Sequence, residues 1–102
     1  MRNMADLRSL QTDVEKQMKD LGHSQDPKII MLFLLEELGE STRAFLKENG
    51  YKENNNRIAE SFRQELGDVF LLLLRLAAVT GTDLENELHH TMDKISKASE
   101  EV

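Results

Sequence analysis

A nearly continuous run of apolar residues from 69 to 79 restricts the possible folds of this chain more than any other feature. Only Arg75 interrupts the run, which is too short to span a bilayer. A helix of this composition is apolar on nearly all sides and must be surrounded by protein. Because 102 residues provide few other elements to cover it, we expect a homodimer or homotetramer with this helix in the interface. A monomer with a central helix is the alternative.

The rest of the sequence is divided into further helices by its single proline and its glycines. Apolar residues between positions 7 and 21 recur every three or four residues, which indicates an amphipathic helix. Asp26-Pro27 is typical of a helix start, and the glycines at 22, 50 and 81 are typical of helix ends. Thr82 and Glu85 match the capping-box pattern at the start of another helix. The expected helices cover about 7–21, 27–49, 57–80 and 82–99.

No segment shows the alternation of apolar and polar residues that is typical of a strand. We therefore predict an all-α fold, a bundle of four helices, in a single domain that spans residues 1–102.

The composition argues against several classes of partner. With 13 basic and 19 acidic residues, the chain has a net charge of −6, and no basic cluster offers a footprint for nucleic acid. The N-terminal residues contain no continuous apolar stretch, so we expect neither a secretory signal nor a membrane partner. The chain has no cysteine, which fits a reducing compartment. We therefore expect a cytoplasmic protein.

Two groups of acidic residues are embedded in apolar sequence. Glu36, Glu37 and Glu40 lie in the string LLEELGE, where helical spacing places them on an arc of about 100°. Glu65 and Asp68 lie in the string ELGD, and their spacing of three places them on one face of the next helix. If the two helices are antiparallel neighbours, the two acidic faces meet.

Five carboxylates in a half-buried cleft repel one another and raise one another's pKa values. Protonation, ion pairing with basic side chains, or bound cations can relieve this repulsion. Oxygen ligands without histidine or cysteine favour Mg²⁺, or alternatively Mn²⁺, over zinc. Glutamates on an exposed helix face are also common without any metal, so a solvated surface is the alternative interpretation.

These residues resemble the signature of the MazG-like nucleoside triphosphate pyrophosphohydrolases, an all-α superfamily. The signature is EExxE followed, after a variable gap, by ExxD. It corresponds here to Glu36-Glu37-Leu38-Gly39-Glu40 and Glu65-Leu66-Gly67-Asp68. The apolar segment after ExxD and the sequence Gly-Thr-Asp-Leu at 81–84 are also similar to the family. The resemblance spans roughly residues 7–97 and implies a four-helix MazG-like bundle that assembles as a dimer or a dimer of dimers.

The resemblance also implies an activity: a nucleoside triphosphate is cleaved between its α and β phosphates to the monophosphate and pyrophosphate. The role implied is house-cleaning of nucleotide pools, with the preferred base left open. The implied Mg²⁺ ligands are Glu36, Glu37, Glu40, Glu65 and Asp68. A glutamate of the first motif, Glu37 or Glu40, would orient or deprotonate the attacking water.

Basic residues for the substrate phosphates are fewer. Many members of the family carry a lysine and a nearby asparagine in the last helix. Here Lys94 and Lys97 are present, but no asparagine follows Asn86. We expect Lys94, and with it Lys97, to contact phosphate. Arg43 follows Glu40 by three residues and either continues the acidic stripe toward the phosphates or pairs with a glutamate of its own helix.

Two other functions stay open at this point. One is a phosphoribosyl-ATP pyrophosphohydrolase, an enzyme of similar helical design. The other is a non-catalytic helical adaptor in which the acidic residues are only surface residues. Metal-dependent release of pyrophosphate distinguishes the enzyme from the adaptor.

Overall fold

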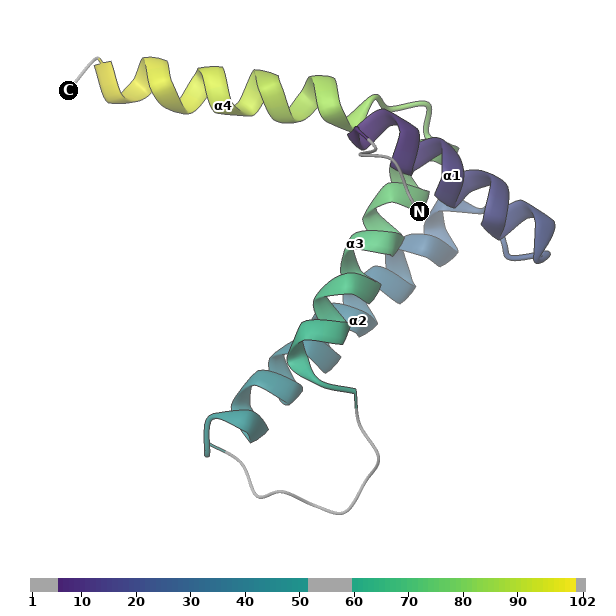
Figure 1. The fold of residues 1–102 in the computed structure, drawn as a ribbon, viewed down its shortest axis with the longest axis vertical. Helices are drawn as coiled ribbons and strands as arrows, with labels where there is room; N and C mark the ends of the chain where they lie inside the picture. The colour runs from purple at the N-terminus through teal and green to yellow at the C-terminus, as the bar shows by residue number, and fades with distance from the viewer. Residues whose placement is uncertain (1–5, 52–59, 101–102) are drawn as a thin grey trace.

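A computed structural model describes residues 6–51 and 60–100. These two ranges contain four helices and no strand: α1 (Leu7–Asp20), α2 (Pro27–Glu48), α3 (Phe62–Val79) and α4 (Leu84–Glu100) (Figure 1). The prediction of an all-helical fold is therefore confirmed for the described residues. That the whole chain, residues 1–102, forms one domain stays a prediction.

Local sequence signals determine where most of these helices begin and end. Asp26 precedes α2 and its carboxylate accepts the backbone N–H of Lys28, with Pro27 in the first turn. Gly22, Gly50 and Gly81 follow α1, α2 and α3 with φ angles of 77°, 78° and 67°. This left-handed conformation is accessible to glycine without steric cost, which confirms the predicted helix ends.

The start of α3 differs from the prediction. The expected start near Arg57 lies outside the described residues. Glu60 and Ser61 are described and are not helical, and α3 begins at Phe62. The Ser61 side chain accepts the backbone N–H of Gln64 and so acts as the N-cap.

The predicted capping box of Thr82 and Glu85 is wrong. The side chain of Asp83 accepts the N–H of Asn86 at 3.1 Å, and α4 begins at Leu84. The hydroxyl of Thr82 lies 2.9 Å from that of Thr80 instead. Both Thr82 and Asp83 are good N-cap residues, and the carboxylate is the one that caps the helix here.

The helices α2 and α3 run antiparallel along most of their length, and α1 crosses the end of α3 where that helix stops (Figure 1). Ile30 is fully buried, and the buried apolar residues of α3 are Leu72, Leu74 and Ala77. The guanidinium of Arg75, also buried, donates a hydrogen bond of 3.0 Å to the carbonyl of Ser24. This bond ties α3 to the connection between α1 and α2.

The helix α4 projects away from the α2–α3 pair and touches α1 near its own first turn (Figure 1). No residue of α4 is buried. The Cα radius of gyration is 16.7 Å, compared with about 13 Å for a compact domain of this length. The chain exposes 8189 Å², whereas a compact monomer of 11.7 kDa exposes about 5,900 Å².

Much of the surface left open on the α2–α3 pair is apolar. A groove of about 700 Å³ lies between the two helices, lined by Met31, Leu32 and Leu35 of α2 and by Leu73 and Leu76 of α3. Among the described residues, no helix combines the length and the apolar character that a membrane crossing requires. An apolar groove of this kind is typical of a surface that binds another molecule.

Candidate metal centre

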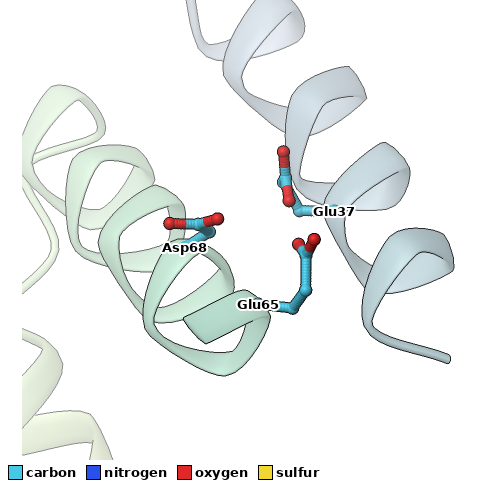
Figure 2. Close-up of side chains that lie close together, drawn as sticks. All are labelled: Glu37, Glu65 and Asp68. Atoms are coloured by element: carbon cyan, nitrogen blue, oxygen red, sulfur yellow. The ribbon is translucent and has the colours of Figure 1, made fainter. Parts of the chain in front are cut away.

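Three carboxylates converge between α2 and α3. Glu37 of α2 points toward Glu65 of α3, with Asp68 beside them (Figure 2). Each of the three offers an oxygen that lies within 4.8 Å of the other two. The meeting of the two acidic motifs, expected for an antiparallel helix pair, is therefore observed for these three residues.

Contacts at the adjoining ends of α2 and α3 hold the two motifs together. The carboxylate of Glu48, the last residue of α2, accepts the backbone N–H of Phe62, the first residue of α3, at 2.7 Å. The rings of Phe45 and Phe62 meet edge to face, with centroids 5.3 Å apart. Since Glu65 lies one turn after Phe62, these contacts place its side chain opposite α2.

Glu65 is the most buried of the three acids, with 7% of its surface exposed. Its Oε2 atom is buried and has no hydrogen-bond partner among the described residues. The pKa of Glu65 is raised to about 7, and burial is the largest cause. A side-chain hydrogen bond with Glu37 and the negative charge of Glu37 are the next causes. Glu60 and Asp68 add further repulsion, so every charged neighbour that shifts this pKa is itself a carboxylate.

Glu60 is a fourth acidic residue at this place and was not predicted. A hydrogen bond with Asp68 is the largest cause that raises the pKa of Glu60, followed by burial and by the charges of Asp68 and Glu37. Glu60 lies outside any helix, directly before the N-cap Ser61, so helical periodicity does not reveal it. Its position next to the start of the helix that carries ELGD is the signal that could have identified it.

The other two predicted ligands lie differently on α2. Glu36 is exposed and Glu40 is half-buried, and neither belongs to the group of three carboxylates within 4.8 Å. At 100° per residue, both positions are rotated from Glu37 toward the side of α2 that faces away from the buried Ile30. Their assignment as metal ligands stays a prediction.

The predicted phosphate-binding residues do not surround the three carboxylates within the chain. Lys94 and Lys97 are exposed on α4, which extends away from the α2–α3 pair (Figure 1). Arg43 is exposed on α2. Their contact with a substrate also stays a prediction.

The arrangement fits a hard divalent cation. The group of Glu37, Glu65 and Asp68 offers only oxygen ligands, which Mg²⁺ and Mn²⁺ prefer. An unpartnered carboxylate oxygen in the protein interior costs free energy unless a proton or a cation satisfies it, and Oε2 of Glu65 is such an atom. The donor set and the unsatisfied oxygen therefore both agree with a magnesium site.

Comparison with known proteins gives two matches. The sequence model of the MazG nucleotide pyrophosphohydrolase domain matches residues 25–102, a range that contains α2, α3 and α4. The crystal structure of YPJD from Bacillus subtilis, a presumed pyrophosphatase, is 26% identical and superposes with a TM-score of 0.76. That match covers 91% of this chain and 97% of the YPJD chain. A search of curated proteins finds no significant match.

Proposed function

Because the chain belongs to the family of MazG nucleotide pyrophosphohydrolase domains, and is thus a hydrolase of phosphoanhydrides, we propose that it cleaves nucleoside triphosphates with Mg²⁺. The bond cleaved lies between the α and β phosphates, and the products are the nucleoside monophosphate and pyrophosphate. The observation that carries this proposal is the buried, unpartnered Oε2 of Glu65 within a group of three carboxylates. House-cleaning of nucleotide pools in the cytoplasm is the cellular role that we propose for this activity.

Glu37, Glu65 and Asp68 would hold the metal ion, with Glu36 and Glu40 as further ligands on the same helix as Glu37. When bound, Mg²⁺, or Mn²⁺ in its place, neutralises charge on the phosphoanhydride and favours ionisation of water. A carboxylate that binds the cation must be ionised. The raised pKa of Glu65 favours a proton on this residue in the metal-free protein, and that proton leaves when the metal binds.

Glu37 and Glu40 are the residues that we propose to act on the attacking water. Glu37 points into the centre of the cluster (Figure 2). Glu40 lies almost one turn further along α2 and is half-buried, as Glu37 is. A carboxylate in either position can accept a hydrogen bond from water and orient it, or remove its proton.

We further propose that the active protein is a homodimer or a homotetramer with α3 in the interface. Leu66, Phe70 and Leu73 of α3 are exposed, and the last of these lines the apolar groove shared with α2. A second α2–α3 pair packed against this groove would complete a four-helix bundle. The large accessible surface and the extended shape of the single chain support this arrangement.

Lys94, Lys97 and Arg43 are the groups that we propose for binding substrate phosphates. Because α4 leads away from the carboxylates of its own chain, its lysines would serve the site of another subunit (Figure 1). A triphosphate carries several negative charges next to an acidic site, so cationic side chains and the metal ion are both needed to hold it. This arrangement makes the activity depend on assembly.

The test is release of pyrophosphate. The protein is incubated with each common and several modified nucleoside triphosphates and with phosphoribosyl-ATP, in the presence of Mg²⁺ or of a chelator. We expect pyrophosphate, and not orthophosphate, from at least one nucleoside triphosphate, with Mg²⁺ present and not with the chelator. Release from phosphoribosyl-ATP alone would correct the substrate, and no release from any of them would overturn the proposal in favour of a binding function.

A further inference from the structure

The helix α4 makes its main contact with α1, near its own start. No residue of α4 is buried, and its apolar side chains Leu88, Met92 and Ile95 are 51%, 54% and 64% exposed. Beyond the first turn, where Leu84 and Glu85 are half-buried, apolar packing inside the described chain does not hold this helix in place. The hydrogen bonds and ion pairs that join this segment to another helix lie where the start of α4 meets α1.

Arg8 of α1 bridges two carboxylates at the start of α4. Its Nε atom lies 2.7 Å from Oδ2 of Asp83, and its Nη1 atom lies 2.8 Å from Oε2 of Glu85. The hydrogen bond from Arg8 is the largest cause that lowers the pKa of Asp83. A guanidinium that donates to two carboxylates restricts geometry more than a single lysine contact can.

Gln11, one turn after Arg8, holds the backbone of the same segment at two points. Its side-chain nitrogen donates to the carbonyl of Thr82 at 2.7 Å, and its side-chain oxygen accepts the N–H of Leu84 at 3.4 Å. Both the donor and the acceptor of one amide are thus used on the turn that leads into α4. A side chain with only a donor or only an acceptor cannot replace it.

We propose that Arg8 and Gln11 are positioning residues, and that the α1–α4 elbow, formed by Arg8, Gln11, Asp83 and Glu85, fixes the direction of α4. Exposed ion pairs contribute little to the global stability of a protein. Beyond its first turn α4 is exposed throughout, so contacts of this kind at its start nevertheless decide its direction. The elbow thereby determines where the lysines of α4 are presented; this second step rests on the proposed function.

The first test measures the direction of α4 without using activity. The chain contains no cysteine, so Thr12→Cys and Ser96→Cys, exposed on α1 and α4, give two unique sites for spin labels. Pulsed electron paramagnetic resonance then measures the distance between the two spin labels. Diluting the labelled protein into unlabelled protein ensures that this distance lies within one chain. Because α1 packs on α3, this distance follows the direction of α4 relative to the rest of the chain.

We expect one narrow distance distribution for the labelled parent and a broadened or shifted one for Arg8→Gln combined with Gln11→Ala. Arg8→Lys keeps the positive charge but cannot donate to both carboxylates through two fixed nitrogens. It should give a distance distribution of intermediate width. Lys16→Gln is the matched control, because it removes an exposed ion pair of α1, with Asp20, that does not contact α4. An unchanged distribution in the double variant and in Arg8→Lys, or equal broadening in Lys16→Gln, would overturn the proposal.

The second test asks whether the elbow serves the reaction. In the double variant we expect KM for the triphosphate to rise about fivefold while kcat changes little, because the phosphate-binding groups are misplaced and the carboxylates are not. With Arg8→Lys alone, KM should rise less than in the double variant. A broadened distance distribution with an unchanged KM would overturn the inference that the elbow places the lysines of α4 for substrate binding. If no triphosphate is hydrolysed at all, the proposed function fails, and the distance measurement still decides the role of the elbow.

Discussion

The α2–α3 pair and α4 all carry apolar side chains at helical spacing, but these side chains have very different surroundings. Ile30 of α2 and Leu74 of α3 are buried against neighbouring helices, whereas Leu88 and Ile95 of α4 remain exposed. The pair carries the acidic centre, and α4 carries the lysines predicted to complement it. The difference teaches that an apolar face in the sequence predicts burial without saying in which chain the covering surface lies.

The largest effect is expected at the acidic centre itself. Asp68→Asn or Glu37→Gln should lower kcat by about a thousandfold, equivalent to about 4 kcal/mol, because a metal ligand or the group that orients water is lost. Pyrophosphate release at saturating Mg²⁺ measures this loss. The substitution Asp13→Asn, at an exposed position of α1, is the control. Helical content, measured by circular dichroism, should stay unchanged in all three variants. Full activity in both Asp68→Asn and Glu37→Gln contradicts the assignment.

The second prediction separates a surface that binds another copy from one that merely faces solvent. Leu35→Glu places a charge in the apolar groove and should weaken self-association by about a hundredfold or more, since an unpaired charge is costly in an apolar interface. Leu35 is 64% exposed in the single chain, so the fold of the protomer itself should tolerate the change. Sedimentation over a range of protein concentrations measures the effect. The same mass for Leu35→Glu and the parent at every concentration would contradict the proposed interface.

The third prediction concerns the pH dependence of stability without divalent cations. The pKa of Glu65 is raised from 4.5 to about 7, so the folded protein binds a proton that the unfolded chain releases. The stability contributed by this proton is fully present below pH 4.5 and is lost as the pH rises toward 7. Between these pH values, the free energy of unfolding should fall by about 2–3 kcal/mol more in the parent than in Glu65→Gln.

Urea denaturation in the presence of a chelator, at several pH values, measures this difference. Because the comparison is between two proteins that share all three histidines, their titration cancels. Parallel stability profiles for the parent and Glu65→Gln would show that Glu65 is not protonated in the folded state.

The smallest effect is expected on α4. Lys94→Ala should raise KM about tenfold, equivalent to about 1.4 kcal/mol, and should leave stability nearly unchanged because the residue is exposed. Lys19→Ala on α1 is the matched control for loss of one exposed positive charge. Steady-state kinetics at fixed Mg²⁺ measures both. An equal rise of KM in the two variants would indicate a general effect of net charge and not a contact with phosphate.

The sequence predicts well what local interactions determine. The helix ends at Gly22, Gly50 and Gly81 follow from the freedom of glycine at positive φ, and the start of α2 follows from Asp26 and Pro27. The spacing of Glu65 and Asp68 likewise places both on one face before any tertiary contact is considered. The predicted position of the Thr82 cap is wrong because two adjacent residues compete for the same role, and Asp83 takes it.

Tertiary direction is what the sequence does not determine. Glu36 and Glu37 are neighbours in a helix that is apolar on several sides, so periodicity alone cannot say which of them turns toward α3. Glu60 lies outside any periodic pattern, and its contact with Asp68 becomes visible only in the folded chain. The direction of α4 depends on the side chains of Arg8 and Gln11, residues more than seventy positions away in sequence.

The contact between Glu48 and Phe62 has a consequence for how such a chain can change during evolution. It fixes both ends of the intervening segment, where α2 ends and α3 begins. Lengthening a segment whose ends are already held adds little entropic cost, because that cost grows only with the logarithm of its length. Insertions and deletions between these anchor points can therefore accumulate and diversify the surface nearby, while Glu37 and Glu65 keep their register.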